Sequence, residues 1–289
     1  MACFNAISGT EAAAGEVVRV VSWNLKWFPG GRPEALAEER EKQMAAAQNV
    51  LKQLNPDILL LQEVANDEAA KELLSVLPDF TVHVVSAFTE RPQNVVVASR
   101  FPAIGAWFEQ WKKRGYHDPP RGFSFAALQA PGGRLLLVYC LHLKSNVGNV
   151  TSNVTKREES SVQLLDHLQQ MIADYGNFEN LGILVGGDFN TSIDDERFSE
   201  EKTIRCLRQA GLFWTFEGVL PGERVTIPAS EGYPDNCFDH ILTSGLGRAQ
   251  SKVVQVPWVS DHNPVILDFD AGINDVIRLR AEGAKPPGR

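Results

Sequence analysis

Hydrophobic residues follow two patterns along the chain, short continuous apolar runs and longer stretches with helical spacing. The apolar runs predict buried strands at 17–23, 57–63, 80–85, 94–99, 181–186, 238–242, 253–256 and 264–269. Residues 123–143 are expected to form two more strands, joined by a turn at Pro131-Gly132-Gly133. Helical spacing predicts helices at 33–54, 67–77, 158–175 and about 199–209. This mixture of strands and helices indicates an α+β fold.

The pattern contains no internal repeat and no linker long enough to separate two domains. We expect one domain at 17–270, with polar tails at 1–16 and 271–289. The longest apolar runs are of strand length, well short of the roughly 18 residues that cross a bilayer, so no membrane span is expected. The first residues lack the features of a signal peptide. Export is slightly favoured if a leader was removed, and a cytoplasmic location otherwise.

The charge composition limits which binding partners are expected. The 28 Lys and Arg residues against 36 Asp and Glu residues give a net charge of −8, which provides no general attraction to polyanions. Any contact with nucleic acid must therefore be local or assisted by a metal. Nothing in the pattern implies a stable protein partner, and we expect a monomer.

Polar residues that carry chemistry follow several predicted strands. Taken alone, each of these residues is more typical of a turn than of a functional site. Together, carboxylates and carboxamides at strand ends supply hard oxygen ligands, which suit Mg²⁺ and also Mn²⁺ or Ca²⁺. The residues are Asn24 in SWN, Glu63 in LQEV, Asp188 and Asn190 in GGDFN, and Asp261 and His262 in SDHNP.

With HLKS and FDHIL, these motifs stand in the order found in the endonuclease/exonuclease/phosphatase superfamily, which the chain resembles over 17–269. The resemblance implies a DNase I-like four-layer α/β sandwich. In that fold two mixed β-sheets lie face to face, flanked by helices, and the site lies at one rim. It also implies a metal-dependent hydrolase of phosphate esters, with 17–270 as its catalytic domain.

The resemblance assigns roles to the motif residues. Glu63 would be the principal metal carboxylate, with Asn24 and Asp261 on the metal or in its water shell. Asp188 would orient or deprotonate the attacking water, and Asn190 would hold a phosphate oxygen.

Four further residues receive roles in the same way. Asp239 in FDHIL would fix the tautomer of His262 and raise its basicity. His142 in HLKS would contact the phosphate or protonate the leaving oxygen. Arg121, just before a strand, would contact the phosphate.

The substrate is less defined by the sequence. The segment 107–122 interleaves aromatic residues with Lys and Arg, which suits stacking of bases and binding of a nucleic-acid backbone. The alternative is a surface loop whose aromatics pack on the core. The favoured function is a phosphodiesterase or endonuclease acting on nucleic acid by in-line attack of water. The alternatives are hydrolysis of a small soluble or lipid-derived phosphate ester, by a phosphomonoesterase or phosphodiesterase, and a non-catalytic binding protein.

The four cysteines form no C-x-x-C spacing. The resemblance to DNase I prompts one weak bridge between Cys206 and Cys237, which would support an exported enzyme.

Overall fold

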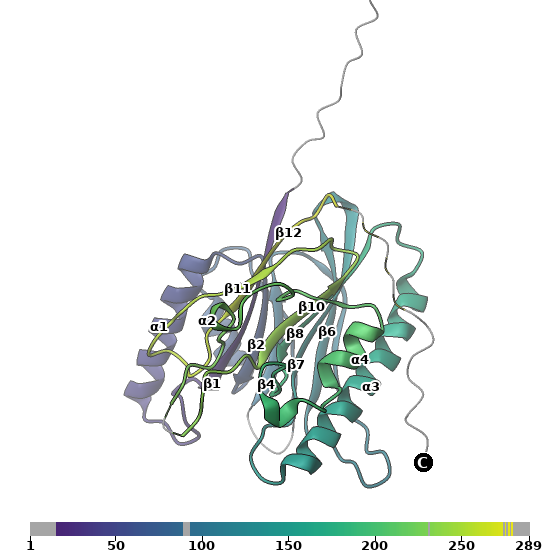
Figure 1. Ribbon diagram of the computed structural model, residues 1–289. Coiled ribbons are helices and arrows are strands. Elements are labelled where there is room, and N and C mark those ends of the chain that lie inside the picture. The colour runs from purple at the N-terminus through teal and green to yellow at the C-terminus, as the bar shows by residue number, and fades with distance from the viewer. Residues whose placement is uncertain are drawn as a thin grey trace, which may run out of the picture.

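The computed structural model describes residues 16–88, 93–230, 232–273, 275, 277 and 279. Within these residues, two six-stranded sheets pack face to face, and helices cover the outer face of each sheet (Figure 1). This is the four-layer α/β sandwich that the sequence predicts. The predicted tails at 1–16 and 271–289 lie mostly outside the described residues.

The first sheet has the strand order β11-β12-β1-β2-β4-β3. β1 runs parallel to β2 and antiparallel to β12, so this sheet is mixed. Its strands are β1 (Val17–Phe28), β2 (Ile58–Val64), β3 (Thr81–Val85), β4 (Asn94–Ser99), β11 (Ser251–Val253) and β12 (Val265–Asp270).

The second sheet has the order β5-β6-β7-β8-β10-β9. β7 and β8 are parallel, and the remaining neighbours are antiparallel. Its strands are β5 (Ala103–Gln110), β6 (Gly122–Ala130), β7 (Arg134–His142), β8 (Leu181–Asp188), β9 (Phe213–Trp214) and β10 (Asp239–Ser244).

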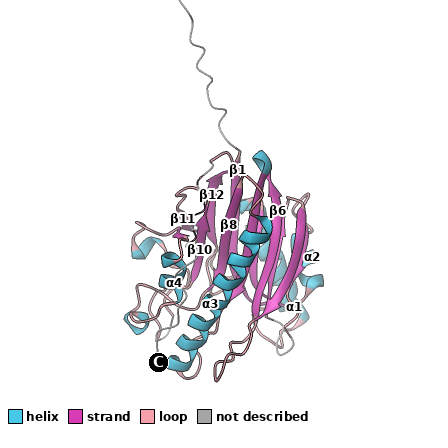
Figure 2. Cartoon of the chain, turned by 90° about the vertical axis from the view of Figure 1, so that its right-hand side faces the viewer, coloured by secondary structure: helices cyan, strands magenta, loops and turns pink. Residues whose placement is uncertain are grey.

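Two helices cover each sheet. α1 (Ala37–Leu54) and α2 (Asp67–Leu74) pack on the first sheet, and α3 (Val150–Tyr175) and α4 (Thr203–Gln209) pack on the second. Figure 2 shows α3 lying along the outer face of its sheet. Short 3₁₀ helices occur at Pro131–Gly133, Glu196–Phe198 and Pro221–Glu223. No helix among the described residues is long and apolar enough to cross a membrane.

The central strands are buried on both faces, which explains their continuous apolar runs. On β2, Leu60 faces the core between the sheets, whereas Leu59 and Leu61 pack against α1 and α2. Alternate residues of one strand therefore belong to two separate hydrophobic layers.

The elements that differ most from the prediction are α3 and the edge strands β5 and β9. α3 begins at Val150 rather than at 158, because Asn149 caps the helix by accepting a hydrogen bond from the Ser152 N–H at 2.9 Å. The polar residues of this first part hide it from a hydrophobic pattern. β5 was not predicted, since it lies at a sheet edge and is only partly buried.

The predicted Cys206–Cys237 bridge is wrong, because both thiols are free. The Cys206 thiol donates to the Thr203 carbonyl oxygen on α4, at 3.4 Å. The Cys237 thiol lies in the interior beside His240 Nδ1, at 3.8 Å. The two side chains thus have different surroundings, and the support that a bridge would lend to export is gone.

Candidate active site

Polar strand ends from both sheets meet at one rim of the sandwich. The parallel pairs β1/β2 and β7/β8 end there, and the antiparallel strands β10 and β12 begin there. Strands that end or begin at a common edge bring their terminal side chains together. The topology therefore gathers residues that are far apart in the sequence.

Three predicted residues are direct neighbours in the second sheet. Asp188 at the end of β8 is in register with His142 on β7 and with Asp239 on β10. Residues in register across a sheet point to the same face. His240, the next residue on β10, points to the opposite face, as the sequence predicts, and its ring contacts the Thr191 carbonyl oxygen and the Trp214 indole N–H.

The two glycines before Asp188 are required by close packing. A Cβ atom at Gly187 would lie 1.9 Å from the Leu141 carbonyl oxygen, and the backbone φ there is +147°. A Cβ atom at Gly186 would lie 2.5 Å from Leu60 Cδ1 in the other sheet. Only glycine allows β8 to approach β7 and the first sheet so closely.

Glu63 reaches the rim because β2 is irregular at its end. Simple alternation would place Glu63 on the same face as Leu61, which packs against the helices. Instead, the pairing of β2 with β4 shifts between Leu61 and Val64, and Glu63 has a φ of +62°. A bulge of this kind re-aims a side chain. The Trp27 N–H then binds the Glu63 carboxylate at 2.9 Å.

Asn24 connects the two sheets. Its amide nitrogen donates to Asp188 Oδ2 at 3.0 Å and to Glu63 Oε1 at 3.3 Å. Its amide oxygen accepts the Lys26 N–H at 3.0 Å. In this arrangement Asn24 holds the two carboxylates together, and it would have to turn its amide over to offer oxygen to a metal.

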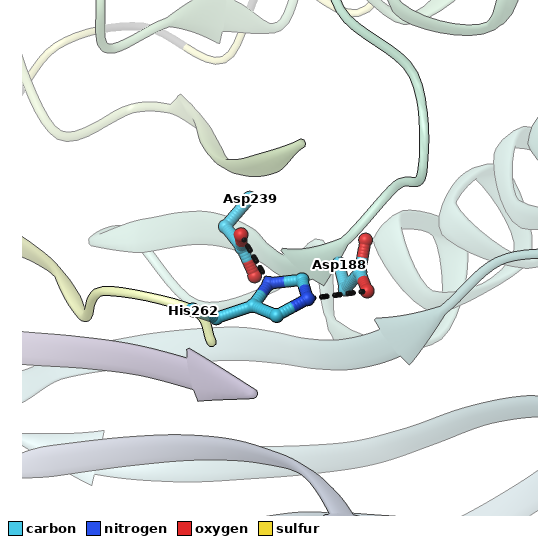
Figure 3. Close-up of side chains that lie close together, drawn as sticks. All are labelled: Asp188, Asp239 and His262. Carbon is cyan, nitrogen blue, oxygen red and sulfur yellow. Dashed lines mark hydrogen bonds and ion pairs between the residues drawn. The ribbon is translucent and has the colours of Figure 1, made fainter. Parts of the chain in front are cut away.

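His262 lies between two carboxylates (Figure 3). Its Nδ1 is 2.8 Å from Asp239 Oδ2, and its Nε2 is 3.9 Å from Asp188 Oδ2. Burial alone would lower the pKa of His262, but the charge and hydrogen bond of Asp239, together with the charges of Asp188 and Asp261, outweigh it and raise that pKa to about 10. His262 is therefore protonated at neutral pH. Thr226 Oγ1 supports Asp239 by accepting its N–H at 3.1 Å.

His142 has the opposite protonation state. Burial, together with the charge of Arg121, lowers the pKa of His142 well below its ordinary value, so the ring is neutral. Its Nε2 lies 3.4 Å from Asp188 Oδ2 and 3.9 Å from Glu63 Oε1. Burial and the charge of Asp239 raise the pKa of Asp188 to about 7. The negative charge on Asp188 is thus poorly stabilised by the protein.

Asn190 and Arg121 both support the end of β7. The Asn190 N–H binds Asp188 Oδ1 at 2.8 Å, and its side-chain amide donates to the Leu143 carbonyl oxygen at 3.2 Å. Arg121 donates to the same carbonyl oxygen at 3.0 Å and to the Gln93 side-chain oxygen at 3.1 Å. Both side chains thus have protein partners at the positions where the sequence predicts phosphate contacts.

Asp261 lies at the outer edge of the rim. Its half-exposed carboxylate pairs with Lys26 Nζ at 3.0 Å. The neighbouring Ser260 donates to the Asn24 carbonyl oxygen at 2.7 Å and accepts the His262 N–H at 3.1 Å.

Sequence reasoning missed the supporting roles of Lys26, Ser260 and Thr226. Ser260 stands inside the SDHNP motif and could have been selected. Thr226 is in no motif, and only the folded loop brings it to Asp239.

The donor set fits a divalent cation. Asp188, Asp239 and His262 each place one polar atom within 4.8 Å of the others, and because His262 is protonated, the carboxylate oxygens of Asp188 and Asp239 are the available donors of this cluster. Asp239 Oδ1 is buried and has no hydrogen-bond partner among the described residues. Glu63 adds a further carboxylate, and hard oxygen donors of this kind bind Mg²⁺, Mn²⁺ and Ca²⁺.

The segment 107–122 contributes less to the rim than its sequence indicates. Trp107 packs on Phe125 with ring centroids 4.5 Å apart, and Trp111 is buried. Arg114 pairs with Glu159 and Asp166 on α3. These two tryptophans serve the core, which is the alternative that the sequence left open. Lys112, Lys113 and Tyr116 are exposed.

A sequence model described as "Endonuclease/Exonuclease/phosphatase family" matches residues 21–262, which include every predicted site residue. Comparison with curated proteins finds no match.

Several solved structures share this fold, some with the family's name and some with other names. An endonuclease/exonuclease/phosphatase from Bacteroides vulgatus has a TM-score of 0.68 at 15% identity, over 88% of this chain and 99% of that chain. TDP2 from Caenorhabditis elegans has a TM-score of 0.65 at 18% identity, over 90% of this chain and 77% of that chain. A mannosyl-6-phosphatase from Bacteroides thetaiotaomicron has a TM-score of 0.64 at 18% identity, over 87% of this chain and 99% of that chain. At these identities the likeness concerns the fold alone.

Proposed function

The chain belongs to the endonuclease/exonuclease/phosphatase family, and from this premise we propose that it is a divalent-metal-dependent phosphodiesterase that cleaves nucleic acid. One observation carries the proposal. A neutral histidine and a charged histidine face the same buried carboxylate, Asp188, which Asn24 joins to Glu63. The proposed catalytic domain is 17–270.

Glu63 is the residue proposed to hold the cation, with Asn24 and Asp261 on the metal or in its water shell. Mg²⁺ is the proposed ion. When bound, a divalent cation polarises a phosphate oxygen and offsets the charge that develops on the leaving oxygen.

Asp188 is the proposed acceptor of a proton from the attacking water. Its pKa of about 7, raised by burial and by Asp239, lies near the working pH, where a general base is most effective. The Asn190 N–H, 2.8 Å from Asp188 Oδ1, orients the carboxylate for this role.

The two histidines take complementary roles in the proposal. Protonated His262, fixed by Asp239, stabilises negative charge on the phosphate and is the better proton donor to the leaving oxygen. Neutral His142 contacts a phosphate oxygen through a ring N–H. Arg121 and the Asn190 amide would reach phosphate only after leaving the Leu143 carbonyl oxygen.

A diester of nucleic acid is favoured over a small ester because the resemblance places His142 among nucleases and other phosphodiesterases. The second candidate is a phosphomonoesterase. It is supported by the mannosyl-6-phosphatase fold, since the matched region spans 99% of that chain.

The test compares nicking of a plasmid with release of inorganic phosphate from mannose 6-phosphate, in Mg²⁺, Mn²⁺ and Ca²⁺. We expect nicking that stops in excess EDTA. Glu63→Ala and Asp188→Ala should each lower the rate at least about a hundredfold with an unchanged circular dichroism spectrum. Glu68→Ala, which removes an exposed carboxylate from α2, is the matched control.

Hydrolysis undiminished by EDTA would contradict the role of the metal. Phosphate release without nicking would replace the nuclease by the phosphomonoesterase.

A further inference from the structure

Trp258 is a fully exposed aromatic residue close to the candidate active site. Its exposed fraction is 97%, and it lies in the turn between β11 and β12, directly after Pro257. Its backbone φ is +76°. A turn with proline followed by a residue of positive φ normally has glycine or asparagine at the second of these positions.

A tryptophan at this position is unfavourable for the folded chain in two ways. The left-handed backbone is strained for a bulky residue, and the indole remains in water. Among the described residues, the indole has no hydrogen bond, ring contact or cation contact. Residues kept in strained conformations without a packing reason are typical of binding sites.

The turn nevertheless holds Trp258 in a defined place. Val256 and Val259 on either side are buried. The Val256 N–H binds Asn263 Oδ1 at 3.1 Å, and the Gln43 side chain on α1 donates to the Val259 carbonyl oxygen at 2.9 Å. The backbone next to the indole is therefore anchored to the body of the protein.

The turn is also continuous with the site. Asp261 follows Trp258 by three residues, so their Cα atoms are at most about 11 Å apart. Ser260, between them, hydrogen-bonds the Asn24 carbonyl oxygen at 2.7 Å. Trp258 is thus held on the same short segment as two residues of the rim, Ser260 and Asp261.

We propose that Trp258 is a specificity-determining residue that stacks on a nucleobase beside the cleaved phosphate. The inference rests on the proposed nuclease function. An exposed indole face suits any base, because every base has a π-face. A membrane surface fits less well, since the chain is acidic overall and the neighbouring exposed residue Gln255 is polar.

The test uses two single-stranded oligonucleotides of identical backbone, one with all bases and one with abasic sites around the cleaved phosphate. Trp258→Ala should raise KM for the complete oligonucleotide about tenfold or more, and should leave KM for the abasic one unchanged. Trp258→Phe should retain most of the affinity. Phe178→Ala, which removes a partly exposed aromatic residue directly after α3, is the control and should change neither value.

Trp258→Gly separates binding from folding. Glycine adopts a positive φ without strain, so the Tm should stay the same or rise while KM for the complete oligonucleotide increases as for alanine. An equal rise in KM for both oligonucleotides would overturn the inference by showing a general effect on the site. An unchanged KM in Trp258→Ala would overturn it as well.

The outcome for the wild-type protein distinguishes this inference from the proposed function. Wild-type protein that neither nicks the plasmid nor cleaves either oligonucleotide in Mg²⁺ or Mn²⁺ refutes the nuclease function, and the inference with it. Plasmid nicking without cleavage of either oligonucleotide refutes the inference alone. Cleavage by the wild-type protein with no effect of Trp258 refutes the inference alone. A Trp258→Ala variant with weakened hydrolysis of mannose 6-phosphate and no base dependence would instead point to stacking on a sugar ring.

Discussion

His142 and His262 lie against the same carboxylate yet differ in charge. His142 is buried and has no close acidic partner other than the shared Asp188 and Glu63, so desolvation dominates and its pKa falls. His262 is equally buried, but Asp239 holds its Nδ1 at 2.8 Å and reverses the effect. A single hydrogen-bonded carboxylate thus decides which histidine carries the proton.

We expect Asp239→Asn to lower the pKa of His262 from about 10, because burial would then be opposed only by the charges of Asp188 and Asp261. The value can be measured by NMR titration of the His262 ring in EDTA. Asp174→Asn, which changes an exposed carboxylate on α3, should leave the titration unchanged.

The same pair should make stability depend on pH. Since the folded-state pKa of His262 is raised, its contribution to the free energy of unfolding is complete below about pH 6.5 and is lost as pH rises towards 10. Asp239→Asn should weaken this dependence and shift it to lower pH, since only Asp188 and Asp261 then raise the pKa of His262. A variant that retained the wild-type pH profile would show that another group is responsible.

The convergence of Glu63, Asp188, Asp239 and His262 could be predicted from the sequence, because each residue stands at a strand end within an ordered motif. The orientation of the Asn24 amide could not. It depends on Lys26, whose N–H donates a hydrogen bond to the amide oxygen and whose side chain forms an ion pair with Asp261. Both contacts arise from the irregular end of β1, where Lys26 and Trp27 have a left-handed backbone that hydrophobic patterning does not describe.

At the scale of elements, the close approach of β7 and β8 depends on Gly187. Gly187→Ala would place a methyl group against the Leu141 backbone at a φ of +147°, so we expect a loss of at least about 2 kcal/mol in the free energy of unfolding. Denaturant unfolding measures it. Gly222→Ala is the control, since a Cβ atom there meets nothing within 4 Å. Equal stabilities of the two variants would contradict the packing argument.

A buried ion pair connects α3 to the segment before α4 and to the loop beside the site. Arg157 is fully buried and forms two hydrogen bonds with Glu201, at 2.6 and 2.8 Å. Its remaining nitrogen binds the Lys144 carbonyl oxygen and Asn146 Oδ1, both at 2.9 Å. Asn146 in turn donates to the Asn190 carbonyl oxygen at 2.9 Å. The pair therefore supports the backbone of a proposed phosphate contact.

Removing one partner would leave a buried charge alone. We expect Glu201→Gln and Arg157→Met each to cost about 3–5 kcal/mol in the free energy of unfolding. The double variant Arg157→Met/Glu201→Gln should cost less than the sum, because no unpaired charge remains. Strict additivity in a double-mutant cycle would show that the two side chains do not act as a pair.

At the scale of the whole molecule, the site belongs to neither sheet alone. Asn24 and Glu63 come from the first sheet, whereas His142, Asp188 and Asp239 come from the second. The apolar runs predict an α+β domain of many strands, and the sandwich follows from the family resemblance that the ordered motifs carry. The edge strands β5 and β9 could not be predicted, because one is partly exposed and the other has only two residues.

The position of β1 has a consequence for how the protein is made. β1 lies between β2 and β12, so the first of the described strands in chain order is paired along one edge by the last of them, from Val17 with Asp270 to Ser22 with Val265. Until translation reaches β12, that edge of β1 has no partner strand. His262 lies three residues before β12, so it is made last among the site residues and is fixed in place only when β12 pairs with β1. Completion of the first sheet and of the site therefore coincide. Under the proposed function, the chain therefore cannot cut nucleic acid before β12 has been translated.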